Sequence, residues 1–142
     1  MTGDKMVAEA RTWIGTPWHH QACLKGVGVD CVGLVRAAYE AATDQKIDLV
    51  FDYHKMAPGG REERVGQTLS QYAVEISKNS LEPGDILLFH FLGGMSNHVG
   101  IYAGEGKFIH AWMTVGKVVE MPLDAVWQRA LGAAFRVPEV RR

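Results

Sequence analysis

The sequence has no concentration of charge of one sign. The 15 lysines and arginines nearly balance the 16 aspartates and glutamates, and the formal net charge is -1. Basic residues are scattered along the chain, except for Arg141 and Arg142 at its end. Because a nucleic-acid-binding domain presents a basic patch or stripe to the phosphates, we expect no nucleic acid among the partners of this protein.

Long hydrophobic runs are missing as well. The longest apolar stretches, such as residues 86–89, have the length of a strand, whereas a helix needs about 20 consecutive apolar residues to span a membrane. Residues 1–5 lack the basic and then apolar layout of a secretory signal. We therefore expect a chain with no membrane span that is made in the cytoplasm without a signal peptide.

Cysteine is scarce, since only Cys23 and Cys31 occur among the 142 residues. Small secreted folds that depend on disulfides usually contain more cysteines, so two free thiols in a reducing compartment are the favoured interpretation. Hydrophobic residues make up 47% and charged residues 22% of the chain, which is an ordinary globular composition. Length and composition together predict a single domain over residues 1–142 with one hydrophobic core.

The periodicity of the apolar residues changes along the chain. Spacings of three and four predict amphipathic helices over 5–14, 31–42 and 61–76. After turn-forming residues at 81–85, short apolar runs predict strands over 86–90, 98–103, 107–112, 117–121 and 132–137, with a short helix at 124–129. Residues 18–30 have no clear period and predict a loop. This order indicates an α+β fold in which N-terminal helices pack on an antiparallel sheet of about five strands.

Cys31 lies at the predicted start of a helix, with Asp30 in a favourable N-cap position. A thiol is a useful nucleophile as the thiolate, and the first turn of a helix stabilises negative charge through its backbone N–H groups and its dipole. Most free cysteines are small core residues. The position of Cys31 therefore permits a catalytic role but does not establish one.

Two histidines lie on neighbouring predicted strands that are joined by residues 104–106. If these three residues form the hairpin loop and Ala103 faces Lys107, then His98 and His110 are diagonal neighbours on one face of the sheet. A two-residue loop would place the two histidines on opposite faces. We expect the three-residue loop.

Both faces of this predicted hairpin are largely apolar, so a helix must cover the face with the histidines. The helix that begins at Cys31 is the expected one. The arrangement would supply a thiolate, an imidazole that transfers the proton and a second group that orients this imidazole. Cys31, His98 and His110 are therefore candidate catalytic residues.

Four short motifs occur in order along the chain. Residues 30–35, 83–89, 98–102 and 108–111 read DCVGLV, PGDILLF, HVGIY and FIHA. In this order and spacing they resemble the NlpC-type cell-wall cysteine endopeptidases, and the resemblance extends from about Gly15 to Trp112. It implies a papain-like cysteine peptidase domain that hydrolyses peptidoglycan stem peptides through an acyl-enzyme, commonly at the bond between γ-D-glutamyl and a diamino acid.

The resemblance also implies a role for each matched residue. Cys31 would be the nucleophile, His98 the general base and later the acid, and His110 the residue that orients His98. Asp30 would help to hold the free amino end of a stem peptide, which is compatible with an N-cap role. Trp18 stands where many members have a tyrosine near the oxyanion, so its indole N–H and the backbone N–H of Cys31 are the expected donors. We expect no cofactor and no metal ion.

Two further features resemble one branch of the family. Val32 occupies a position that is commonly serine, and residues 19–22, which read HHQA, precede the cysteine. Together with the missing export signal, these features look most like the phage and prophage members. They imply a protein carried in the tail of a phage or phage-like particle, with other tail or baseplate proteins as further partners.

Three alternatives stay open. The first is a zinc site, although the spacing does not form two tight ligand pairs; its ligands would be His19, His20, Cys23 and Cys31. The second is a structural tail protein with the same fold and little activity. The third is a different amidase or acyltransferase, because a papain-like scaffold and its triad do not fix the acyl donor.

Overall fold

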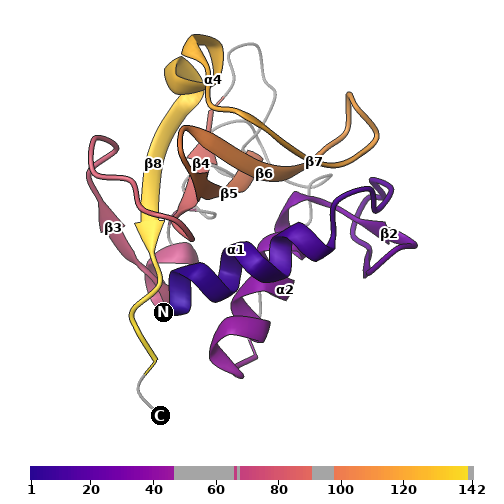
Figure 1. The fold of residues 1–142 in the computed structure, drawn as a ribbon, viewed down its shortest axis with the longest axis horizontal. Helices are drawn as coiled ribbons and strands as arrows, with labels where there is room; N and C mark the ends of the chain where they lie inside the picture. The colour runs from indigo at the N-terminus through magenta and orange to yellow at the C-terminus, as the bar shows by residue number, and fades with distance from the viewer. Residues whose placement is uncertain (47–65, 67, 91–97, 141–142) are drawn as a thin grey trace.

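The computed structural model describes residues 1–46, 66, 68–90 and 98–140, and Figure 1 shows how its elements are arranged. The first elements along the chain are α1 (Thr2–Thr12), β1 (Cys23–Leu24), β2 (Gly28–Val29), α2 (Cys31–Thr43) and β3 (Val74–Ile76). They are followed by β4 (Ile86–Phe89), β5 (His98–Gly104), β6 (Lys107–Trp112), β7 (Lys117–Pro122), α4 (Ala125–Ala130) and β8 (Leu131–Arg136). Within the described residues, no helix is both long and apolar enough to cross a membrane.

The strands form one large sheet and one small one. The large sheet has six strands in the order β3-β8-β4-β5-β6-β7, and its neighbouring strands pair antiparallel. The small sheet consists of β1 and β2 and lies in the segment 18–30, for which the sequence predicts a loop. The predicted α+β fold with N-terminal helices on an antiparallel sheet is confirmed, with six strands in place of about five.

The additional strand lies at the end of the predicted helix 61–76. Residues 68–72 are helical, but Val74–Ile76 form β3, which pairs with β8 so that Ile76 faces Ala134. The helix prediction is therefore wrong over 74–76. Val74 and Ile76 are β-branched, and pairing with a strand some sixty residues further along the chain decides their conformation. Residues 61–65 and 67 lie outside the described part of the chain.

The two N-terminal helices pack against each other. In α1 the side chains of Met6, Val7 and Ala10 are buried, whereas Ile14, which the sequence includes in the helix, follows its end and is 47% exposed. In α2 the helix ends where Asp44 adopts a left-handed conformation with φ 56°. Apart from Ile14, the apolar residues that predict each helix are therefore the ones that it buries.

Two apolar clusters lie on opposite faces of the large sheet. The larger one joins α1 and α2 to Val99, Ile101, Ile109 and Ala111 of β5 and β6. The smaller one contains alternate residues of the same strands together with Trp127 of α4, and its buried members are Leu87, Phe89, Phe108, Leu123, Trp127, Leu131 and Ala134. In Figure 1, α1 and α2 lie together below the sheet and α4 lies at the top.

The β5–β6 hairpin differs in detail from the predicted three-residue loop. Gly104, and not Ala103, faces Lys107, and the turn has two residues with positive φ, 54° at Glu105 and 73° at Gly106. A bulge between Tyr102 and Gly104 takes up one extra residue of β5. On the side of the bulge away from the turn, Tyr102 faces Phe108 and Ile101 faces Ile109, as a three-residue loop would give. His98 and His110 therefore share a face, as predicted.

Candidate active site

Cys31 is the first residue of α2, and Asp30 caps this helix. The carboxylate of Asp30 accepts two backbone N–H bonds of 2.8 Å, one from Gly33 in the first turn and one from Gln21 in the preceding loop. Asp30 is buried and Cys31 is 8% exposed. The cap thus fixes the loop against the helix start and places the thiol where the helix dipole favours negative charge.

Gly33 allows the preceding loop to pack closely on the first turn of α2. A Cβ atom at Gly33 would lie 2.8 Å from the carbonyl oxygen of Ala22. The thiol of the other cysteine, Cys23, donates to the carbonyl oxygen of Gly33 at 3.3 Å. Cys23 therefore has a structural contact beside Cys31.

The two predicted histidines are in direct contact. Nε2 of His98 lies 2.7 Å from Nδ1 of His110, which is a strong hydrogen bond between ring nitrogens. His98 is 6% exposed and His110 has no exposed surface. Because Nε2 of His98 is engaged by His110, Nδ1 is the nitrogen of His98 that can take part in proton transfer with a substrate or a thiol.

Aromatic rings enclose this histidine pair. Phe89 stacks on His98 at 6.0 Å between ring centroids, Trp112 lies 4.9 Å from His98, and Trp127 lies 5.0 Å from His110. Burial in this apolar surrounding lowers the pKa of His110 to about 3. Burial, with a smaller contribution from the neighbouring His110, also lowers the pKa of His98 well below its ordinary value of 6.5. Both imidazoles are therefore neutral at pH 7.

The helix that covers the histidine face is α4. His98 and His110 alternate with the residues that α1 and α2 cover, and they contact Trp127 of α4 on the opposite face. The prediction that the helix beginning at Cys31 covers the histidines is therefore wrong for the body of α2. The sequence did not decide this point because both faces of the hairpin are apolar. Contacts of α2 with β5 and β6 bring the helix of Cys31 to the two strands that carry the histidines.

Met121 is a site residue that the sequence reasoning missed. It lies on β7, where Val119 faces His110, and its sulfur is 3.0 Å from Nε2 of His110. Residues two apart on a strand share a face, so the pairing of β6 with β7 was the signal that places Met121 beside His110. Without knowledge of this strand pairing, a methionine in a predicted strand is interpreted as a core residue.

Trp18 lies next to the strand that leads into Asp30. It forms a parallel bridge with Val29, and its backbone N–H donates to the carbonyl oxygen of Gly116 at 2.8 Å. The loop that carries Trp18 is thus held between β2 and the turn that joins β6 to β7. The structure brings Trp18 close in the fold to the start of α2, and its role with the oxyanion stays a prediction.

The described residues contain no group of three or more histidine, cysteine, aspartate or glutamate side chains arranged to hold one metal ion. His19, His20, Cys23 and Cys31 all belong to this described part of the chain. The zinc alternative requires these four side chains to converge, and they do not form such a group.

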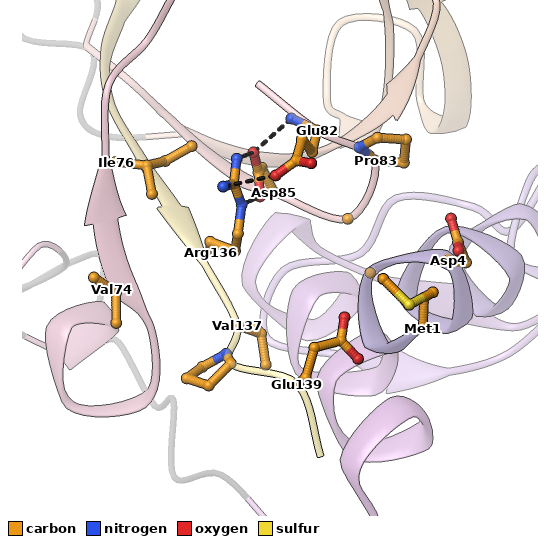
Figure 2. A pocket seen from close by; sticks show the side chains of 13 residues that line it. Met1, Asp4, Val74, Ile76, Glu82, Pro83, Asp85, Arg136, Val137 and Glu139 are labelled. Atoms are coloured by element: carbon orange, nitrogen blue, oxygen red, sulfur yellow. Dashed lines mark hydrogen bonds and ion pairs between the residues drawn. The ribbon is translucent and has the colours of Figure 1, made fainter. Parts of the chain in front are cut away.

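A cavity of about 470 Å³ lies away from these residues, and Figure 2 shows its lining. Its wall includes Asp85, whose carboxylate accepts hydrogen bonds from Arg136. Asp85 precedes the first residue of β4, whereas His98 pairs with Phe89 at the last residue of β4. The cavity is therefore at the other end of this strand, and none of the five predicted site residues lines it.

The fold and the site together define a class of protein. An N-terminal helical layer on an antiparallel sheet, a cysteine at a helix start and a buried histidine pair on adjacent strands are the features of a papain-like cysteine hydrolase. Comparison with known proteins narrows this class. Residues 15–136 match the NlpC/P60 family, and the chain belongs to it. This membership confirms the predicted resemblance to the NlpC-type cysteine peptidases.

Relatives in bacteria support the assignment. The chain is 29% identical over 131 residues to the probable endopeptidase NlpC of Escherichia coli K12, covering 91% of this chain and 74% of that protein. It is 31% identical over 131 residues to the murein DD-endopeptidase MepH of the same organism, covering 87% of this chain and 42% of that protein. The chain thus spans less than half of the length of MepH.

Solved structures show the same fold. The NlpC/p60 domain of the peptidoglycan hydrolase SagA superimposes with a TM-score of 0.67 and 27% identity, covering 95% of this chain and 98% of that one. An NlpC/P60 family protein of Bacillus cereus ATCC 10987 superimposes with a TM-score of 0.69 and 23% identity, covering 96% of this chain and 40% of that one.

Proposed function

We propose that this chain hydrolyses peptidoglycan stem peptides at the bond between γ-D-glutamyl and a diamino acid, with Cys31 as nucleophile and His98 as general base. The observation that carries the proposal is the buried contact of 2.7 Å between His98 and His110. A buried, oriented imidazole on a strand that contacts the helix beginning at a cysteine fits the arrangement required for thiol acyl transfer. Family membership supports the substrate class.

The reaction would proceed through two acyl transfers. Nδ1 of His98 takes the proton from the thiol of Cys31 as its sulfur attacks the scissile carbonyl carbon. The bond from that carbon to the amide nitrogen breaks, His98 gives the proton to the departing amine, and a thioester remains on Cys31. A water molecule then attacks the thioester while His98 takes its proton, and the carboxylic acid leaves as the proton returns to the sulfur.

The neutral state of His98 fits this sequence of steps. Because burial lowers its pKa well below 6.5, His98 is already the free base at pH 7. The sequence predicts a thiolate at Cys31, and burial of the neighbouring imidazole opposes its protonation by lowering the pKa of His98. His110 then serves to orient His98.

Two further residues belong to the proposal through the family resemblance. Trp18 would donate its indole N–H to the oxyanion together with the backbone N–H of Cys31. Asp30 would contact the free amino end of the stem peptide in addition to capping α2. Its two carboxylate oxygens each accept one backbone N–H and have further lone pairs for such a contact.

The experiment is incubation with defined stem peptides, followed by mass spectrometry of the products. The substrates are a free stem tetrapeptide and a cross-linked dimer, because MepH is named a DD-endopeptidase and a cut at the cross-link would be a different bond. Cleavage between γ-D-glutamyl and the diamino acid is expected, and Cys31→Ala should abolish it. Cys23→Ala is the matched control and should retain activity, because the Cys23 thiol contacts a backbone carbonyl.

The outcomes separate the alternatives. Cleavage only at the cross-link would replace the proposed bond with another one. If neither peptide is cleaved by the wild-type protein, the endopeptidase proposal fails, and the structural tail protein or another amidase or acyltransferase becomes the better interpretation. Cleavage that persists in Cys31→Ala would remove Cys31 from the role of nucleophile.

The placement in a phage or phage-like tail is a separate proposal. It rests on Val32, where serine is common, and on residues 19–22 before the cysteine. Proteomic analysis of purified particles and of cell fractions tests it. Recovery of the protein with tail or baseplate proteins is expected, and recovery from cell fractions alone would overturn the placement.

A further inference from the structure

Met121 completes a chain of contacts that begins at His98. Nε2 of His98 meets Nδ1 of His110 at 2.7 Å, and Nε2 of His110 meets the Met121 sulfur at 3.0 Å. Each ring nitrogen of His110 therefore has one defined partner. The pairing of β6 with β7, in which Met121 faces Phe108, holds the methionine on the face of His110.

The chemistry of the two partners fixes which nitrogen of His110 carries the proton. A thioether sulfur has lone pairs and no hydrogen, so it can accept a hydrogen bond but cannot donate one. Nε2 of His110 must then be the protonated nitrogen. In the neutral imidazole this leaves Nδ1 as an acceptor, and the hydrogen bond between the histidines must run from Nε2–H of His98 to Nδ1 of His110.

The direction of this hydrogen bond also determines which nitrogen of His98 carries a proton. If neutral His98 carries its proton on Nε2, its Nδ1 has the lone pair that can accept the thiol proton. The opposite arrangement would place a proton on Nδ1 of His110 and the lone pair of its Nε2 against the sulfur lone pairs. His98 would then be protonated at Nδ1 and unable to act as a base through that nitrogen.

We propose that Met121 is a positioning residue that selects the protonation pattern of the two histidines in which Nδ1 of His98 is the base. The inference deepens, and rests on, the catalytic roles proposed above for Cys31 and His98. Burial sharpens the requirement, because His110 has no exposed surface and a buried ring nitrogen needs a defined partner. Met121 does not contact the reacting atoms, so its effect passes through His110.

Nitrogen-15 NMR of the histidine rings tests the protonation pattern without any substrate. At pH 7 the wild-type protein should show both His98 and His110 protonated at Nε2, with assignments from single histidine variants. In Met121→Leu, which keeps the volume and removes the acceptor, His110 should shift measurably toward the form protonated at Nδ1. Protonation of wild-type His110 at Nδ1 would overturn the proposal, as would an unchanged pattern in Met121→Leu.

Kinetics supply the second readout. Met121→Leu should lower kcat by about tenfold to a hundredfold, by analogy with the loss of groups that orient metal-binding histidines, and should leave KM nearly unchanged. Met121→Gln, whose amide oxygen is an acceptor of similar reach, should recover part of the loss. Met6→Leu is the matched control, because Met6 is buried in α1, and it should keep wild-type kcat.

Failure of this inference differs from failure of the proposed function. If the wild-type protein cleaves stem peptides and Cys31→Ala does not, while Met121→Leu keeps wild-type kcat, only the role of Met121 is wrong. If the wild-type protein cleaves no stem peptide, the proposed function fails and the NMR pattern alone decides on Met121. A kcat loss that Gln does not relieve, with an unchanged NMR pattern, would assign the effect to packing and overturn the inference.

Discussion

Gly100 lies directly against His110. A Cβ atom at position 100 would be 3.2 Å from Cβ of His110 and 3.2 Å from a ring carbon of Phe108. These distances are tighter than ordinary van der Waals contact, so β5 approaches β6 closely only because position 100 has no side chain. The close approach is part of what brings the His98 ring within 2.7 Å of His110.

Gly100→Ala should displace His110 and weaken its contact with His98. We expect a lower kcat with little change in KM, and a loss of about 1–3 kcal/mol in the free energy of unfolding, which is typical of overpacking. Steady-state kinetics and urea denaturation measure the two effects. Gly66→Ala is the control, because among the described residues no atom outside its own helix backbone lies within 4 Å of a Cβ at that position. Equal behaviour of the two variants would contradict the prediction.

The stability of the fold should fall as the pH drops below 6.5. Burial lowers the pKa of His110 to about 3, so between these two values the unfolded chain binds a proton that the folded protein does not. The free energy of unfolding then decreases toward acid pH by about 1.4 kcal/mol per pH unit for this histidine. The pKa of His98 is lowered as well, so this histidine also makes the free energy of unfolding decrease toward acid pH.

Urea denaturation of the wild type and of His110→Asn between pH 6.5 and 5 measures this dependence. In this window carboxylates with ordinary or lowered pKa values contribute little. The slope against pH should be about half as steep in the variant, because one of the two buried histidines no longer titrates. Equal slopes in the two proteins would show that protonation of His110 does not lower the free energy of unfolding.

Asp30 should have two separable effects. Asp30→Ala removes the cap of α2 and should lower the free energy of unfolding by about 1–2 kcal/mol. Asp30→Ser keeps a capping oxygen and removes the charge, so its main effect should be a higher KM for a stem peptide with a free amino end. The same peptide with an acetylated amino end is the control. Equal effects on both peptides would leave Asp30 with the capping role alone.

We expect Trp18 to contribute to acylation by donating its indole N–H to the oxyanion. Trp18→Phe removes this donor, and the loss of one oxyanion donor typically lowers kcat by about 10²- to 10³-fold. Trp18→Tyr supplies the hydroxyl that many family members have, and it should retain more activity than the phenylalanine variant. Single-turnover measurement of acylation compares the three proteins. Wild-type acylation rates in Trp18→Phe would remove Trp18 from the oxyanion site.

Local signals in the sequence predicted much of this site. The Asp30 cap and the apolar stripe after it place the start of α2 at Cys31, because both depend on residues within one or two turns. The strand that carries His110 has the predicted bounds, Lys107–Trp112. These features depend on neighbours in the chain, which the sequence displays directly.

Other features depend on contacts between distant residues. Strand β3 exists because it pairs with β8, and this pairing ends at residues 74–76 the helical period that residues 68–72 follow. Which helix covers the histidines is decided by packing of α4 through Trp127. Met121 has the composition of a core residue, and only its strand partner shows that its sulfur meets an imidazole.

Because of the bulge in β5, the hairpin of β5 and β6 can lose one residue without a change in which face carries His98 and His110. Deletion of Ala103 would leave Gly104 opposite Lys107 and Tyr102 opposite Phe108 in a regular ladder. Straightening the bulge at constant length would instead place Tyr102 opposite Ile109 and turn His98 to the other face. Hairpins that differ by one residue at this point can therefore present the same pair of histidines, whereas a slip of one residue between the strands cannot.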